Sequence, residues 1–199
     1  HNGSRGLGDV YKRQQLMRIK TEECCLLIID IQEKLIPLIS NKDDVVDTSL
    51  DLIDIASNLK IPIILTEQYP KGLGNTKKII KDSLIGKDFF MIQKTSFSCF
   101  DSTDFKKQLS SLGKKQIIIA GIESHICVMQ TVLDLKASGY EIFLVEKAIG
   151  SRKDSDRMLG LNRMVNSKVC LTSTEMLIFE LVRDSKHTLF KYFSKKYIK

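Results

Sequence analysis

Short apolar runs alternate along the chain with longer segments in which apolar residues recur every three or four positions. The runs predict strands at 24–29, 61–65, 89–93, 116–120, 141–145 and 168–171. The segments with helical spacing predict helices at 45–59, 76–84, 103–112, 128–137, 155–166 and 174–183. Because each strand is apolar almost without interruption, we expect both faces of the sheet to be buried, as in a parallel sheet. The alternation of strands and helices therefore predicts an open, doubly wound α/β sheet.

The composition is typical of one globular domain. The 199 residues suit a single domain of ordinary size, and 43% of them are hydrophobic. No apolar stretch approaches the roughly 20 residues that a membrane-spanning helix needs, so we expect no membrane association. The five cysteines form no CxxC pair and no disulfide framework, which is typical of a reduced, intracellular chain. We therefore expect a cytoplasmic protein.

The net charge of +7 raises the possibility of a nucleic-acid partner. Much of this charge lies in the tail segment KYFSKKYIK and in scattered lysine pairs, which we interpret as solvated faces. The sequence contains no RNP, zinc-finger or KH pattern. We therefore expect a small-molecule partner rather than nucleic acid.

The first sixteen residues differ from the rest of the chain. The stretch HNGSRGLGDVYKRQ has no apolar periodicity, and Met17 directly precedes the first predicted structure. We predict that residues 1–16 are a non-native leader and that residues 17–199 form the single folded domain.

Reactive side chains stand at the ends of three predicted strands. The first strand ends at Asp30, the third ends at Lys94, and the fourth runs into GIESHIC, whose last residue is Cys127. In open α/β sheets, ligands bind beyond the carboxyl ends of the strands, near the point where the strand order reverses. We therefore expect a carboxylate, an ammonium group and a thiol at one rim of the sheet.

A thiol attacks as a thiolate, so Cys127 needs a lowered pKa or a base. Its predicted position at a helix N-terminus is expected to stabilise the anion. The histidines of the chain are His1, His125 and His187. None is well placed as the base: the first lies in the leader, the second is two positions from the cysteine, and the third is near the C-terminus. Asp30 is the favoured base, with Lys94 as the cation that favours the thiolate and balances developing negative charge.

Each of the three residues also has an ordinary structural explanation. Asp30 could cap a helix, with Glu33 completing a capping box. Lys94 could be a solvated lysine, and Cys127 could be a small buried hydrophobe. The three strand-end residues together are more specific than any one of them.

Five segments carry a resemblance to a known family. They read LLIIDIQEKL, PIILTEQYPKGLGNT, IQKTSFSCF, IIIAGIESHICVMQTVLDLKASGYEIFLVEKAIGSR and LTSTEMLIFELV. Together they resemble the isochorismatase-like cysteine hydrolases, in particular the branch of isochorismatase domain-containing and YcaC-like proteins, and they cover almost all of residues 19–195 in the family order. The resemblance implies a three-layer fold, with a doubly wound six-stranded parallel sheet flanked by helices. It also implies a catalytic triad of Asp30, Lys94 and Cys127.

The resemblance implies a reaction as well. Asp30 would take the thiol proton of Cys127, and the thiolate would attack a small amide-like or related carbonyl substrate. A thioester acyl-enzyme would form, and water would hydrolyse it. Relatives have a cis peptide bond at the position of Ile122–Glu123, which aims the backbone N–H groups of Glu123 and Cys127 at the oxyanion.

The family comparison also bears on metals and on substrate contacts. Nicotinamidases, which are related to this branch, carry an Asp-x-His and a further histidine after the second strand. The corresponding stretch here, TEQYPKGLGNT, has no histidine, so we expect no metal and no other cofactor. The segments EQYPKG and SFSCF are expected to wall the pocket, with Gln68, Tyr69 and Phe97 as substrate contacts.

Two other classes of function stay open. The chain could be a non-catalytic binding or scaffold protein on the same fold, or a nucleic-acid-acting member of the branch.

The resemblance implies a homo-oligomer, and segment 175–193 holds more apolar residues than one face of a terminal helix needs. These residues are Met176, Leu177, Phe179, Leu181, Phe190 and Phe193. We expect this segment near or in the interface.

Overall fold

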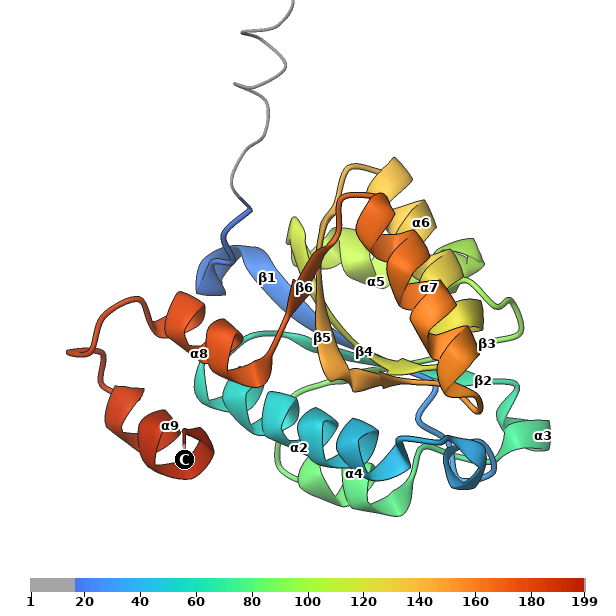
Figure 1. The fold of residues 1–199 in the computed structure, drawn as a ribbon, viewed down its shortest axis with the longest axis horizontal. Coiled ribbons are helices and arrows are strands. Elements are labelled where there is room, and N and C mark those ends of the chain that lie inside the picture. The colour runs from blue at the N-terminus through green and yellow to red at the C-terminus, as the bar shows by residue number, and fades with distance from the viewer. Residues whose placement is uncertain (1–16, 199) are drawn as a thin grey trace, which may run out of the picture.

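A six-stranded parallel sheet forms the centre of the computed structural model, which describes residues 17–198 (Figure 1). The strands are β1 (Cys24–Ile29), β2 (Ile63–Gln68), β3 (Phe90–Lys94), β4 (Gln116–Ile122), β5 (Glu141–Gly150) and β6 (Cys170–Thr172). They lie in the order β3-β2-β1-β4-β5-β6, and every neighbouring pair is parallel. The doubly wound α/β fold predicted from the sequence is confirmed. The segment predicted as a leader, 1–16, lies outside the described residues.

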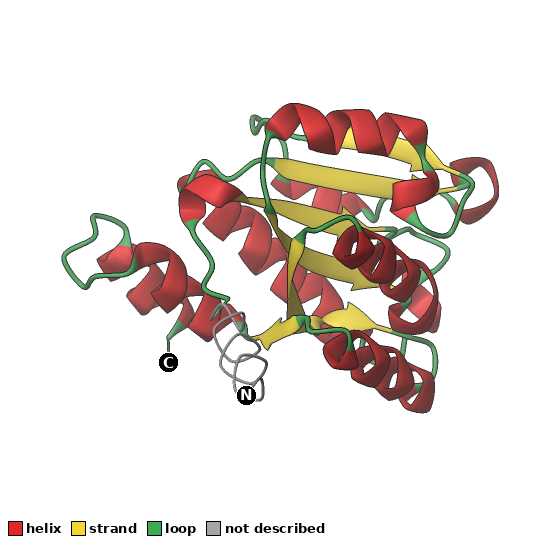
Figure 2. Cartoon of the chain, turned by 90° about the horizontal axis from the view of Figure 1, so that it is seen from above, coloured by secondary structure: helices red, strands yellow, loops and turns green. Residues whose placement is uncertain are grey.

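Helices cover both faces of the sheet (Figures 1 and 2). One face carries α2 (Lys42–Asn58), α4 (Lys78–Ser83), α8 (Thr174–Val182) and α9 (Phe190–Tyr197). The other face carries α5 (Thr103–Leu112), α6 (Met129–Ala137) and α7 (Asp154–Asn166). Short elements join them: α3 (Pro70–Leu73), the 3-10 turns η1 (Thr21–Glu23), η2 (Ile36–Leu38) and η3 (Cys99–Asp101), and the π-helix η4 (Ser124–Val128). The result is a three-layer arrangement.

Alternation along the strands divides the core into two layers. On β1, Leu26 and Ile28 belong to the layer that contacts α2, whereas Leu27 and Ile29 belong to the layer that contacts α5, α6 and α7. All six residues of β1 are buried, as in a sheet covered on both faces. Side chains at the ends of the strands can therefore meet only if they enter the same one of these two layers.

Two strands extend further than their apolar runs. The predicted strand 61–65 is observed as β2, which continues through the polar residues Thr66, Glu67 and Gln68. Strand β3 pairs with all three of them, and β1 pairs with Thr66. The predicted strand 141–145 continues to Gly150. Apolar patterning marks only the buried core of a strand, so it missed these polar ends. It also missed the short helix α3 and the terminal helix α9.

The C-terminal helices are attached to the rest of the fold. Phe193 is fully buried in the α2 layer, and the hydroxyl groups of Tyr192 and Tyr197 donate to the Asp54 carboxylate on α2. Leu177 and Leu181 are also buried within the chain. Much of the apolar surface predicted for an interface is therefore used internally.

None of the helices within 17–198 has the length and apolar character needed to cross a membrane.

Candidate active site

The three strand-end residues come together where the strand order reverses. Asp30 follows β1, Lys94 ends β3, and Cys127 lies in η4, directly after β4. Strand β1 pairs with β2 on one side and with β4 on the other, so the two halves of the sheet diverge at this point. Asp30 is 1% exposed, Lys94 is 5% exposed and Cys127 is 7% exposed. The cluster is therefore nearly closed to solvent.

A left-handed backbone turn brings Asp30 to the cluster. Its φ is 54°, a conformation that Asp adopts more readily than most residues. Simple alternation along β1 would have placed residue 30 in the α2 layer. Its carboxylate instead accepts hydrogen bonds from Thr66 Oγ1 at 2.7 Å and from Lys94 Nζ at 2.8 Å. Because both donors are side chains and no helix begins here, the helix-cap explanation of Asp30 is wrong.

The ammonium group of Lys94 is surrounded by acceptors from the protein. It donates to Asp30 Oδ2 at 2.8 Å, to Gln68 Oε1 at 2.8 Å, and to the carbonyl oxygens of Ser96 and Phe97 at 3.1 Å each. Burial lowers the pKa of Lys94, but the negative charge of Asp30 and the hydrogen bond to it act in the opposite direction, and the pKa is raised. Lys94 is a buried partner of Asp30, and the solvated-lysine explanation is wrong.

The thiol of Cys127 is neutral at rest. The Asp30 carboxylate lies near enough to act on it. Burial, followed by the negative charge of Asp30, raises the pKa of Cys127, and the opposing effect of Lys94 is smaller. The sequence predicted that a helix N-terminus would stabilise the thiolate, and in that respect the prediction is wrong, because burial and the adjacent carboxylate dominate. Attack by this thiol needs a base.

The segment between β4 and Cys127 is tightly fixed. Gly121 has a φ of 138°, and a Cβ atom at this position would lie 2.2 Å from the carbonyl oxygen of Ile29. The peptide bond between Ile122 and Glu123 is cis, as the resemblance implied. The carboxylate of Glu123 accepts from the backbone N–H and from Nε of Arg152, each at 3.0 Å. Because Gly121 has no Cβ atom, strand β4 can approach β1 closely beside Asp30.

The three predicted substrate contacts differ in what they offer. Both amide atoms of Gln68 are engaged, Oε1 with Lys94 and Nε2 with the carbonyl oxygen of Thr95 at 2.7 Å. Tyr69 is 54% exposed and Phe97 is 56% exposed. Gln68 is therefore better placed to hold Lys94 than to bind a substrate, while the two aromatic side chains remain free to contact one.

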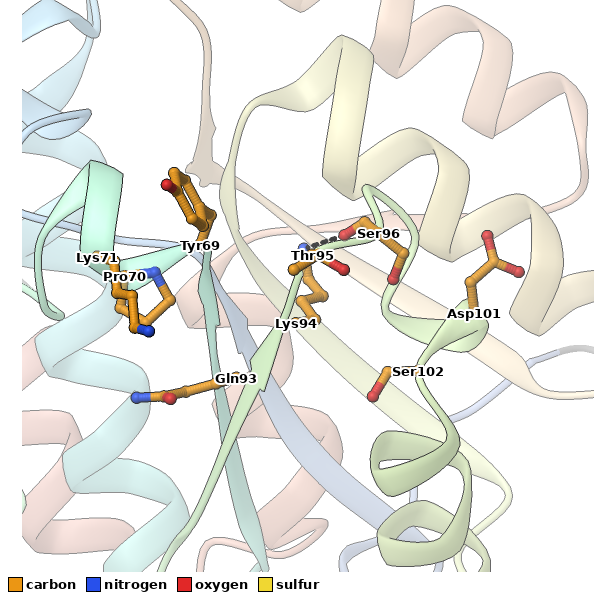
Figure 3. Close-up of a pocket in the computed structure, with 9 residues that line it drawn as sticks. All are labelled: Tyr69, Pro70, Lys71, Gln93, Lys94, Thr95, Ser96, Asp101 and Ser102. Atoms are coloured by element: carbon orange, nitrogen blue, oxygen red, sulfur yellow. Dashed lines mark hydrogen bonds between the residues drawn. The ribbon is translucent and has the colours of Figure 1, made fainter.

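A hollow of about 500 Å³ opens beside the end of β3 (Figure 3). Tyr69 and Lys71 lie on one side of it and Asp101 and Ser102 on the other, with Lys94 between them. The lining residues do not include Cys127. This hollow adjoins the cluster but does not by itself expose the thiol.

Several contacts around the cluster were not predicted from the sequence. Thr66 donates to Asp30, and the Sγ of Cys99 lies 3.8 Å from Thr66 Oγ1. The Gln32 side chain accepts from the backbone N–H of Gln68 at 2.7 Å and donates to its carbonyl oxygen at 2.9 Å, which ties the end of β2 to the segment after β1. A polar residue at the end of an otherwise apolar strand was the available signal for Thr66.

The two histidines within the described residues do not face the thiol as bases. The Nδ1 of His125 lies 3.0 Å from Ser151 Oγ, and its Nε2 lies 3.9 Å from Asp156. His187 accepts a hydrogen bond from the backbone N–H of Leu189. Across 17–198, no three His, Cys, Asp or Glu side chains are grouped as metal ligands would be.

The fold and the site define an α/β protein with a buried acid, amine and thiol at the switch point of its sheet. The isochorismatase domain matches residues 24–176. Isochorismatase family protein 1B of Dictyostelium discoideum is 37% identical over 180 residues, which cover 89% of this chain and 87% of that protein. The chain belongs to the isochorismatase family.

Solved structures agree with this assignment. MAR1 ribonuclease from Caenorhabditis elegans is similar with a TM-score of 0.85 and 36% identity, covering 92% of this chain and 93% of that chain. The YcaC gene product of Escherichia coli, described as an octameric hydrolase of unknown specificity, is similar with a TM-score of 0.82 and 26% identity, covering 91% of each chain. The family thus includes hydrolases.

Proposed function

We propose that the chain is a cysteine hydrolase in which Asp30, Lys94 and Cys127 act on a small amide-like or related carbonyl substrate. The observation that carries this proposal is the grouping of a neutral, buried thiol with a carboxylate that lies 2.8 Å from a buried lysine. A carboxylate in that position can accept the thiol proton as the sulfur attacks. Detection of an acyl group on Cys127, with a panel of small amides and esters, tests the proposal.

The proposed first half-reaction transfers the acyl group to the enzyme. Asp30 takes the proton of Cys127 while the sulfur forms a bond to the carbonyl carbon, and the carbonyl electron pair moves to the oxygen. The tetrahedral adduct collapses, the bond to the leaving group breaks, and the leaving group takes the proton from Asp30. The product is a thioester on Cys127 and a free amine or alcohol.

The proposed second half-reaction releases the acid. Asp30 takes a proton from water as the water oxygen attacks the thioester carbonyl. The carbon–sulfur bond breaks, and the thiolate recovers its proton from Asp30. Backbone N–H groups of Glu123 and Cys127 are proposed to receive the developing oxyanion. Lys94 acts through Asp30, because its own N–H groups already have acceptors within the protein.

The buried position of the cluster supports a small substrate rather than RNA. One structural relative carries the name ribonuclease, but Asp30, Lys94 and Cys127 are all less than 8% exposed. A polynucleotide binds along an open, basic surface. A small molecule can enter a closed site, and the exposed aromatic residues Tyr69 and Phe97 are proposed to stand at its entrance.

Hydrolysis is expected to be independent of metal ions. The proposed mechanism uses only side chains and water, and the stretch after β2 has no histidine. Hydrolysis of p-nitrophenyl acetate should be unchanged after prolonged treatment with EDTA. A loss of activity that zinc restores would contradict the prediction.

We expect a homo-oligomer, with the exposed apolar residues of α8 in the interface. Met176 and Phe179 stay exposed one turn apart, and the ring of Phe179 packs 5.8 Å from that of Phe190. Light scattering should give a mass well above the 22.6 kDa of one chain, and Phe179→Glu should lower it. A monomer at micromolar concentration would refute the prediction.

A further inference from the structure

Behind the proposed base lies a hydroxyl group that the mechanism above does not use. Thr66 stands on β2 beside the end of β1, and its Oγ1 lies 2.7 Å from Asp30 Oδ1. Both side chains are 1% exposed. An ionised carboxylate can only accept, so the hydroxyl hydrogen of Thr66 points to Asp30.

A second thiol lies on the far side of this hydroxyl. The Sγ of Cys99 is 3.8 Å from Thr66 Oγ1, and the backbone N–H of Cys99 donates to Thr131 Oγ1 at 2.9 Å. Burial, followed by the charge of Asp30, raises the pKa of Cys99 to about 11, so the thiol keeps its proton at neutral pH. Because the hydrogen of Thr66 is directed to Asp30, its oxygen is free to accept the S–H of Cys99.

We propose that Thr66 is a positioning residue for Asp30, and that Cys99 fixes the direction in which the Thr66 hydroxyl donates. This inference rests on the proposed function and deepens it. Thr66 holds Oδ1 of the carboxylate and Lys94 holds Oδ2. Two donors on two different oxygens prevent the carboxylate from rotating, so its plane stays fixed relative to the thiol of Cys127.

The surroundings of Asp30 show what each donor does. The titratable groups around it are Lys94 from β3, Cys127 from η4 and Cys99 from η3. Lys94 donates to Oδ2, so removal of the Thr66 hydroxyl releases Oδ1 and lets the carboxylate turn about the oxygen that Lys94 still holds.

The test is the rate at which p-nitrophenyl acetate acetylates Cys127, followed by peptide mass spectrometry. Thr66→Val should lower this rate by about 10- to 100-fold, the range expected for loss of a hydrogen bond to a charged group. Thr66→Ser, which keeps the hydroxyl, should retain a rate within about threefold of the wild type.

Three further variants separate positioning from packing. Thr66→Ala removes the hydroxyl without adding a methyl group, so it should match Thr66→Val and replaces it if that variant does not fold. Cys99→Ala should slow acetylation less than Thr66→Val, because the hydroxyl that meets Asp30 is still present. Thr172→Val makes the same exchange at a buried position on β6 and should leave the rate unchanged.

Two results would overturn the inference, and they differ from failure of the proposed function. Thr66→Val or Thr66→Ala with a wild-type rate would show that the hydroxyl does not act on Asp30. Thr66→Ser as slow as Thr66→Val would show that the methyl group of Thr66, and not its hydroxyl, matters. If the wild type were not acetylated at Cys127 at all, the proposed nucleophile itself would be wrong.

Discussion

Asp30→Asn should abolish hydrolysis while the chain stays folded. An amide cannot accept the thiol proton, and general-base catalysis typically contributes about 10²- to 10⁴-fold. The fold should persist, at reduced stability, because Asn tolerates the left-handed backbone of residue 30 and its amide oxygen can still accept from Thr66 or Lys94. The Lys94 ammonium loses its counter-ion but keeps its other acceptors. Acylation of Cys127 and thermal unfolding, measured on the same preparation, check both parts. Asp104→Asn, an exposed change in the first turn of α5, is the matched control.

Asp30→Asn should make the Cys127 thiol more acidic even though hydrolysis is lost. The negative charge of Asp30 is, after burial, the main cause of the raised pKa of Cys127, whereas Lys94 lowers that pKa. Removing the charge should therefore lower the pKa, and iodoacetamide should alkylate Cys127 at a lower pH than in the wild type. If Asp30→Asn still hydrolysed the substrate and its Cys127 kept the raised pKa, Asp30 would not be the base.

Lys94→Met should cost both stability and activity. The change removes one partner of an ion pair whose side chains are 0% and 1% exposed, so the carboxylate of Asp30 is left buried without a counter-ion. Breaking a buried pair in this way typically lowers the free energy of unfolding by about 3–5 kcal/mol. Urea unfolding at neutral pH measures the loss. Acylation should also slow, because Oδ2 of Asp30 loses the donor that holds the base in place.

A double variant identifies the cause of that loss. Asp30→Asn together with Lys94→Met removes the unpaired charge, so it should be more stable than Lys94→Met alone. The pH dependence gives a second check. Because the folded protein raises the pKa of Lys94, the pair contributes fully below pH 10.5, the ordinary value for lysine, and the contribution is lost as pH rises through the raised value. If Lys94→Met were as stable as the wild type, the prediction that the Asp30–Lys94 pair stabilises the fold would be wrong.

The sequence predicted the order of the elements and the ends of the strands that carry the site. Each core strand is a continuous apolar run, so the positions of Asp30, Lys94 and Cys127 at one rim followed from parallel topology alone. Segments whose structure depends on distant partners were missed. The terminal helix α9, for example, is held by the hydrogen bonds of Tyr192 and Tyr197 to Asp54, more than one hundred positions away.

The electrostatics of the site could not be predicted from spacing. Alternation along β1 assigns Asp30 to the wrong layer, and only its left-handed φ of 54° brings it to Cys127. The pKa of the thiol depends on burial and on that contact, so reasoning from a helix N-terminus gave the wrong direction. Thr66 escaped notice because a threonine in a strand is an ordinary feature. Cys99 belongs to the SFSCF segment expected to wall the pocket, but its contact with Thr66 was not predicted, because a buried cysteine is equally ordinary.

Acetylation by p-nitrophenyl acetate, mapped to individual residues by mass spectrometry, tests the central claim most directly. Cys170, the most exposed of the described cysteines, gives the background reactivity of a thiol outside the site. The proposed function predicts a single acetyl group on Cys127 of the wild type, its disappearance as hydrolysis proceeds, and no such adduct in Cys127→Ser. Acetylation of Cys170 or of lysines with Cys127 unmodified, or undiminished hydrolysis by Cys127→Ser, would contradict the claim that Cys127 is the nucleophile.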